Sequence, residues 1–244
     1  MVEAFLWGLL AASSLVVGAG IAALHPPHRR ALGLVMGFGA GVLLSAVSFE
    51  LVEEAANTSG GTGGTGLGFF TGALVFLAGD WAISRMGYQS RKSIAGVAPA
   101  ASGLAILLGV ILDGIPESAV IGLTLLDGGE VGLAMLVAVF ISNVPEAIAA
   151  TTSLRASGWS LRRLFALWTV TAVGSGLASA AGYGLLADAS GSVLAFVLAF
   201  AGGAILAMLS TTMMPEAYEH AGRTVGLVTT FGFALAFAIN WYSG

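Results

Sequence analysis

The chain contains no cysteine and very few charged residues. Only 9% of its 244 residues are Asp, Glu, Lys or Arg, whereas soluble domains carry roughly 25%. The lack of cysteine excludes disulfides and thiolate metal ligands. The remaining composition is 57% hydrophobic, with a mean hydropathy of +0.94. These properties exclude an ordinary soluble domain and predict an all-α polytopic membrane protein.

Long apolar runs recur along the chain, separated by short breaks rich in Gly, Ser or charge. Because a bilayer core is crossed by about 20 apolar residues, the runs predict eight transmembrane helices in one domain, 1–244. Their approximate bounds are 3–24, 31–54, 66–85, 99–126, 131–153, 162–187, 192–216 and 223–242. The first run has no basic leader and no small-residue cleavage site, so we expect it to be retained.

Basic residues are few and unevenly distributed. They are Arg29, Arg30, Arg85, Arg91, Lys92, Arg155, Arg162, Arg163 and Arg223. With eight spans, all of them fall on one side of the membrane. The positive-inside rule makes that side cytoplasmic, so both termini are predicted to be extracytoplasmic. The opposite breaks carry acids, which either attract cations or simply reflect loops without Lys and Arg.

Two of the predicted helices resemble each other in sequence. The stretch "AGVLLSAVSFELVEEA" at 40–55 aligns with "GGAILAMLSTTMMPEA" at 202–217. Ser48 then matches Ser210, and Glu54 matches Glu216. The two helices would cross the membrane in opposite directions, which is the pattern of an inverted repeat in secondary transporters. We therefore expect a 3+2+3 arrangement, with 3–85 and 162–242 as the repeats and 99–153 between them.

The two central helices share a shorter motif. "DGIPES" at 113–118 corresponds to "SNVPEA" at 142–147, and each places a Pro-Glu pair deep in an apolar run. Pro116 and Pro145 each remove one helical hydrogen bond and are expected to kink their helices. The carbonyl groups that they free belong to Leu112 and Ile141.

Carboxylates inside an apolar helix are costly. Each costs about 2.5–3.5 kcal/mol near the bilayer centre, and no Lys or Arg lies within these two spans. A proton or a cation must therefore neutralise them, and the two would compete for one site. Residues four apart share a helix face, so the motif predicts a cation site. Its candidate ligands are Asp113, Glu117, Glu146, Asn143, Ser142 and Glu50.

The motifs resemble those of the ZIP (Zrt-, Irt-like) family of divalent-metal transporters. In that family the fourth span typically reads His-Asn-x-Pro-Glu-Gly and the fifth carries a second x-Pro-Glu-Gly. Glu117 and Glu146 match the central ligands of the family, and "MMPEA" in the seventh span resembles its Pro-Glu-Ala motif. The resemblance covers the whole chain and implies eight spans, outward termini and a metal site between spans four and five.

The chain also departs from the ZIP pattern. Asp113 stands where the family has His, and Gly114 stands at the Asn position without a side-chain ligand. Glu50 replaces the His of the second span, and Ser179 stands where relatives with two metals place Glu. We therefore expect one principal metal site.

The metal is less defined than the site. The resemblance implies Zn²⁺ as first choice, with Mn²⁺, Fe²⁺ or Cd²⁺ also open. The predicted donors are nearly all oxygen, which shifts the expectation toward Mn²⁺ or Fe²⁺. Further cation contacts are predicted at Glu54, Glu216 and His220.

We therefore predict a transporter that carries divalent transition-metal cations into the cytoplasm across a bacterial inner membrane. Its expected partners are the cations and the lipid bilayer, with no nucleic acid; a homodimer stays open. No HExxH, GxSxG or intramembrane Ser–His pair is present, so an enzyme is not expected. A second interpretation also stays open, in which the buried acids are protonated packing groups in a membrane protein for another solute.

Overall fold

The computed structural model describes residues 1–243 except 26, 60–62, 86–102 and 127–130. Every regular element in this part of the chain is a helix. The elements are α1 (Val2–Leu24), α2 (Arg29–Ala46), the π-helical η1 (Val47–Val52), α3 (Glu53–Thr58), α4 (Gly64–Arg85), α5 (Gly103–Thr124), α6 (Leu133–Ala156), α7 (Leu161–Leu186), α8 (Gly191–Met208), the π-helical η2 (Leu209–Met213), α9 (Met214–Ala221) and α10 (Thr224–Ser243).

The elements form eight long rods, because α2, η1 and α3 are continuous and so are α8, η2 and α9. Seven rods in the described residues are long and apolar enough to cross a membrane. The remaining rod, α5, has 22 residues. The predictions of an all-helical fold and of an integral membrane protein are thereby confirmed. The first four residues of the predicted span 99–126 lie outside the described residues.

Two predicted helix ends were wrong. The second rod continues to Thr58 instead of ending at residue 54, and the seventh continues to Ala221 instead of 216. In both cases the apolar run stops while the helix goes on through polar residues. A helix ends where its backbone hydrogen bonds end, so polarity alone placed these ends too early.

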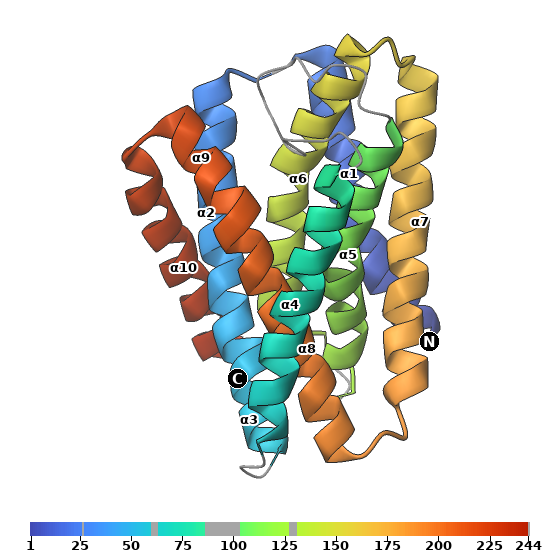
Figure 1. Cartoon of the computed structure of the whole chain (residues 1–244), viewed down its shortest axis with the longest axis vertical. Helices are drawn as coiled ribbons and strands as arrows, with labels where there is room; N and C mark the ends of the chain where they lie inside the picture. The colour runs from blue at the N-terminus through green and yellow to red at the C-terminus, as the bar shows by residue number, and fades with distance from the viewer. Residues whose placement is uncertain (26, 60–62, 86–102, 127–130, 244) are drawn as a thin grey trace.

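Each of the two stretches with similar sequences contains a π-helical segment. The first residue of η1, Val47, and the first residue of η2, Leu209, are paired in the alignment of 40–55 with 202–217. The Ser48 hydroxyl donates to the Leu44 carbonyl at 2.8 Å, and the matched Ser210 hydroxyl donates to the Leu206 carbonyl at 2.8 Å. The two rods run in opposite directions in Figure 1.

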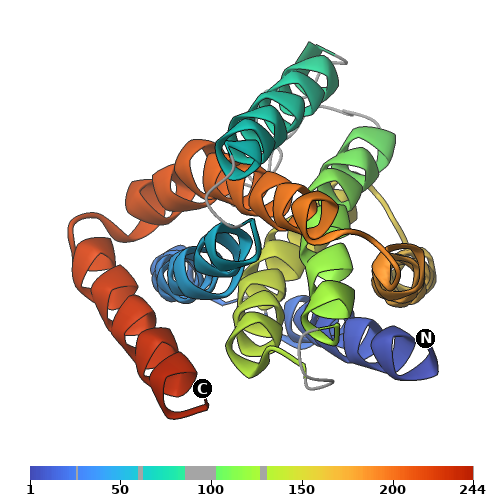
Figure 2. The ribbon, with the colours of Figure 1, turned by 90° about the horizontal axis from the view of Figure 1, so that it is seen from below.

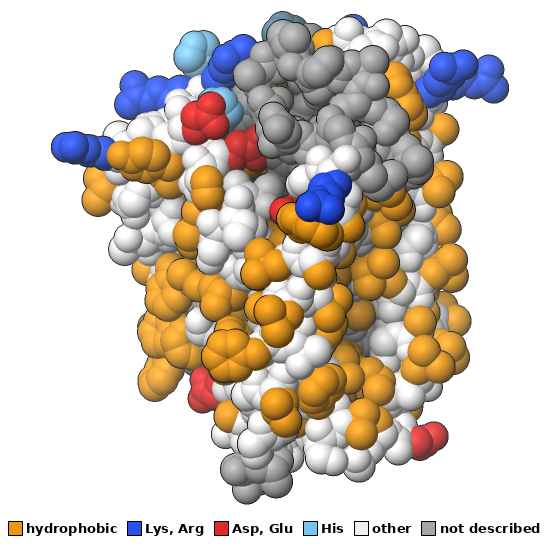
Figure 3. All heavy atoms as spheres, viewed as in Figure 1, with side chains coloured by type: hydrophobic (Ala, Val, Ile, Leu, Met, Phe, Trp, Pro, Cys, Tyr) orange, Lys and Arg blue, Asp and Glu red, His pale blue; other side chains and the backbone are white. Residues whose placement is uncertain are grey.

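The two ends of the molecule differ in charge. Both chain termini lie in the lower half of Figure 1. Arg side chains gather at the opposite end of the face shown in Figure 3, and hydrophobic side chains cover the flank between the ends. Near the Arg-rich end, the Arg85 guanidinium lies 3.9 Å from the ring centroid of Trp81. Amphipathic Trp and Arg side chains at such a level are typical of a membrane boundary.

The rods pack as two bundles. The first bundle consists of α1, α5, α6 and α7, and the second consists of α2–α3, α4, α8–α9 and α10. Figure 2 shows this division from the end of the molecule. The bundles meet mainly where α6 packs on α2 and where α5 packs on α8.

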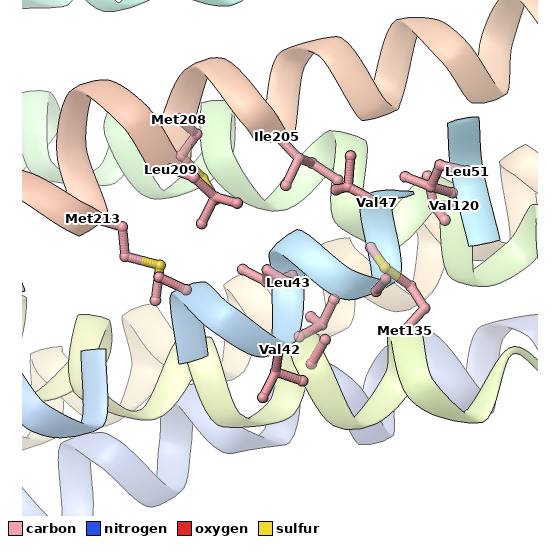
Figure 4. Close-up of a cluster of buried hydrophobic side chains, with 14 of the residues drawn as sticks. Val42, Leu43, Val47, Leu51, Val120, Met135, Ile205, Met208, Leu209 and Met213 are labelled. Carbon is pink, nitrogen blue, oxygen red and sulfur yellow. The ribbon is translucent and has the colours of Figure 1, made fainter. Parts of the chain in front are cut away.

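Buried apolar side chains fill the space between the bundles. Figure 4 shows this cluster around α2 and η1, with contributions from α5, α6 and α8–η2. Its labelled members are Val42, Leu43, Val47, Leu51, Val120, Met135, Ile205, Met208, Leu209 and Met213, all of them buried. In a bilayer such a cluster is stabilised by close packing and dispersion, because lipid tails are as apolar as these side chains.

Glycine allows the rods of the second bundle to approach at backbone distance. At five positions in the described part of this bundle, a Cβ atom would collide with a carbonyl oxygen of the facing helix. The five contacts are Gly41 against Thr229, Gly68 against Phe196, Gly72 against Phe200, Gly203 against Phe69, and Gly232 against Phe38. Small residues at helix crossings allow this approach in membrane proteins.

We predict that Gly203→Leu destabilises the protein by about 3 kcal/mol or more, because the facing backbone cannot yield as a flexible side chain could. Thermal unfolding followed by tryptophan fluorescence in detergent measures the change. Gly226→Leu is the control, since Gly226 is exposed and nothing lies within 4 Å of its Cβ position. Equal unfolding temperatures for the two variants would contradict the role given to Gly203.

Candidate cation site

The acidic motif of the first central helix lies on α5. Asp113 and Glu117 are 3% and 2% exposed and are one helical turn apart, with Pro116 inside the helix. The motif is enclosed by neighbours from both bundles. On the preceding turn, Leu112 packs against Gly79 of α4, and on the following turn the Ala119 carbonyl lies beside Gly182 of α7.

The second motif lies on α6. Ser142, Asn143 and Glu146 are buried, with Glu146 6% exposed, and Pro145 lies inside the helix. Two neighbouring helices close over it through glycine: Gly18 of α1 lies against Val144 and Ala147, and Gly39 of α2 lies against Ser142. The two motifs predicted from the sequence therefore both lie in buried parts of long apolar helices.

The two helices present oxygen donors of several kinds. The helices that carry these donors, α5 and α6, both belong to the first bundle and contact each other. Within the described ranges, no three His, Asp or Glu side chains converge closely enough to hold a metal ion. A cation bound here would also need neutral donors, such as the amide of Asn143, the hydroxyl of Ser142 and the carbonyls of Leu112 and Ile141. The Ser142 hydroxyl donates to Val139 at 3.1 Å, so its oxygen can still accept or coordinate.

Glu50 has a defined partner in the structure. It lies within η1, and its carboxylate oxygens accept from the backbone N–H of Met135 at 3.1 and 3.2 Å. Met135 is in the first turn of α6, whose N-cap residue is Gly132. The predicted ligand is thus held at the N-terminus of the helix that carries Glu146.

Glu50 also lines an open cleft of about 950 Å³. The other polar groups of the cleft include Glu3, Glu54 and Asn240. The Thr58 hydroxyl donates to Glu54 at 2.7 Å. The cleft lies toward the end of the molecule that holds both termini, since residues near both ends of the chain line it. The predicted contact Glu54 is therefore in the cleft.

The remaining predicted contacts lie at the other end. Glu216 and His220 are one turn apart on α9, and both are half-buried. The Cβ atom of His220 lies close to Gly33 of α2. Neither residue borders the cleft of Glu50, so the structure separates the predicted contacts into two groups at opposite ends.

Sequence reasoning missed two buried polar contacts around the motifs. The indole N–H of Trp168 on α7 donates to the Thr151 hydroxyl on α6 at 2.8 Å. The hydroxyl of Ser179 on α7 donates to the carbonyl of Ala4 on α1 at 2.7 Å. A Trp and a Thr within apolar runs are the signals that could have pointed to the first contact, but their pairing depends on packing.

Neither the models of known protein families nor the curated proteins give a match to this chain.

We predict that Trp168→Phe destabilises the protein by about 1–3 kcal/mol, through the lost hydrogen bond and the smaller ring. Both partners are fully buried, with Trp168 1% and Thr151 0% exposed. Thermal unfolding of Trp168→Phe, Thr151→Val and the double variant forms a double-mutant cycle. Fully additive effects would show that the hydrogen bond does not couple α6 to α7.

Proposed function

We propose that the protein is a transporter of divalent transition-metal cations, with its binding site between α5 and α6. The observation that carries the proposal is the burial of Asp113, Glu117 and Glu146 on two proline-containing helices of a membrane protein. Ionisable residues within a membrane are expensive and mark ion pathways by default. No Lys or Arg lies in the stretches 103–124 and 131–153 that carry these acids, and Arg155 is in the last turn of α6, two turns beyond Glu146. The three acids are therefore proposed to be neutralised by exchangeable cations or protons.

Zn²⁺ is the first choice of cargo, with Mn²⁺, Fe²⁺ and Cd²⁺ as further candidates. The resemblance of both Pro-Glu motifs to the ZIP family supports Zn²⁺. The oxygen-rich donor set supports Mn²⁺ or Fe²⁺ as well. Asp113, where the family has His, makes the site harder in character, because a carboxylate oxygen replaces an imidazole nitrogen.

The rods are proposed to form a 3+2+3 inverted repeat. In such a repeat, α2 corresponds to α8 and α4 corresponds to α10. The contact between α4 and α8 then corresponds to the contact between α10 and α2, and both pairs of helices pack together. The glycine contacts follow the same exchange, since Gly41 and Gly203 are matched in the alignment and both face a carbonyl. The matched π-helical segments η1 and η2 further support the proposal.

The transport direction is proposed from charge. The Arg-rich end faces the cytoplasm by the positive-inside rule, so the termini and the cleft of Glu50 face outward, here across a bacterial inner membrane. Cations would enter the cleft, shed water at the α5 and α6 motifs, and leave past Glu216 and His220. Alternating access would shift the first bundle relative to the second along the interface in Figure 4.

We predict that Glu117→Gln and Glu146→Gln each lower Zn²⁺ uptake into proteoliposomes by about tenfold or more, because each removes a charge that offsets the cost of desolvating the cation. Mn²⁺, Fe²⁺ and Cd²⁺ are tested in parallel to rank the cargo. Asp188→Asn is the matched control, since Asp188 is an exposed acid in the turn before α8.

Uptake by the two glutamine variants at the wild-type rate would make these acids packing groups and overturn the proposed site. The variants are compared only if they elute as single species in size-exclusion chromatography. Loss of uptake in Asp188→Asn as well would indicate a general surface-charge effect.

We further predict that Zn²⁺ stabilises the wild-type protein against heat in the absence of any gradient. Ligand at about 100 times its Kd adds roughly 2.7 kcal/mol of apparent stability. The shift should vanish in Glu117→Gln and persist in Asp188→Asn. An equal shift in all three proteins would place the bound Zn²⁺ elsewhere.

A further inference from the structure

Glu50 connects the two bundles. It belongs to the second bundle, and its carboxylate accepts from the N–H of Met135 in the first bundle at 3.1 and 3.2 Å. The interhelical hydrogen bonds of Ser179, Trp168 and Thr229 each stay within one bundle. The Glu50 contact therefore joins one bundle to the other, whereas each of the other three contacts joins helices of the same bundle.

The N-terminus of α6 is built to receive this carboxylate. The first N–H groups of a helix lack partners within the helix, and this end carries partial positive charge. The N-cap Gly132 offers no side chain, and Glu50 supplies an acceptor that carries a negative charge when it is ionised. A Cβ atom at Gly132 would lie 2.5 Å from Oε2 of Glu50. The φ of Gly132 is −59°, which any residue can adopt, so a larger residue here would act by displacing the Glu50 carboxylate.

A second contact holds the start of α6 without a charge. The backbone N–H of Gly132 donates to the Thr124 hydroxyl at 3.0 Å. Thr124 is the last residue of α5, which belongs to the same bundle as α6, so this bond stays within the first bundle. It provides an internal comparison for Glu50, because both bonds act on the same helix end and only one crosses between bundles.

The two matched π-helical segments differ at this position. Residue 50 of η1 aligns with Thr212 of η2 in the alignment of 40–55 with 202–217. The Thr212 hydroxyl lies 3.5 Å from that of Thr211, its neighbour in the chain. At this position, a carboxylate is present in the first half of the repeat and a hydroxyl in the second. The Glu50 contact therefore favours one arrangement of the bundles over the arrangement in which the two repeats exchange roles.

We propose that Glu50 is a positioning residue that stabilises the cleft-open arrangement of the two bundles by binding the N-terminus of α6. The proposal rests on the proposed function, in which the bundles alternate between two arrangements. Because α6 carries Glu146, a shift of its N-terminus relative to the second bundle also moves the cation site. Glu50 thus sets how often the site is open to the cleft and is not a resident ligand of the metal.

Thiol labelling tests the proposal, since the chain has no cysteine of its own. Leu133→Cys reports from the first bundle, because Leu133 lines the cleft and is 49% exposed. Asn240→Cys reports from the second bundle on the same cleft. The rate of reaction with an anionic maleimide is measured in lipid nanodiscs without metal, in backgrounds carrying wild-type residues, Glu50→Gln, Glu54→Gln or Thr124→Val.

Glu50→Gln is expected to slow labelling at both reporters by about threefold or more, as the weakened contact lets the cleft close. A purely electrostatic effect has the opposite sign. Removing a negative charge favours the reactive thiolate and admits the anionic reagent, so Glu54→Gln should leave the rates unchanged or raise them. Thr124→Val should slow them less than Glu50→Gln does.

Unchanged or faster labelling in Glu50→Gln would overturn the proposal, and so would equal slowing in Thr124→Val. Slowing at Leu133→Cys alone would show a local effect on α6 and would also overturn it. If Glu50→Gln fails to fold by size-exclusion chromatography, Glu50→Asp replaces it, with a shorter reach and the same expected slowing. Labelling without metal separates the two claims: slow labelling in a protein that transports no cation leaves the contact standing and removes the transport function.

Discussion

The structure depends on one constraint: in a bilayer, apolar helices gain little by leaving lipid for each other. Association then rests on close approach, where many weak dispersion contacts add up. The glycines at 41, 72, 203 and 232 meet this constraint by bringing backbones together without an intervening Cβ atom. Once the rods are held in this way, the polar residues on α5 and α6 are enclosed by the packing around them.

Much of the fold could be predicted because the strongest signals are compositional. An apolar run of bilayer length predicts a helix whatever its neighbours are, and seven such helices are found in the described residues. The ends of the second and seventh rods could not be predicted from polarity. Their helices continue through Asn57 and through Glu219 because hydrogen bonding, which polarity does not measure, persists there.

The candidate site was predicted as far as residue types and spacing reach. Asp113, Glu117 and Glu146 stand out because carboxylates are expensive in apolar helices, and the structure places all three in buried positions. The partner of Glu50 could not be predicted. Met135 is 85 residues away and contributes a backbone N–H, which every residue but proline possesses. Only the packing of α2 on α6 selects that one group.

The tightest glycine contacts of the described residues have a mechanical consequence. They run inside each bundle, as with Gly122 against Ser179 and Gly203 against Phe69. Between the bundles, contact is made largely by side chains, including Met135 and Met208. Interlocked backbones resist shear, whereas flexible thioethers can repack as surfaces slide. The molecule is therefore stiff within each bundle and compliant along one seam, so that a change in bilayer thickness would be absorbed as slip along that seam.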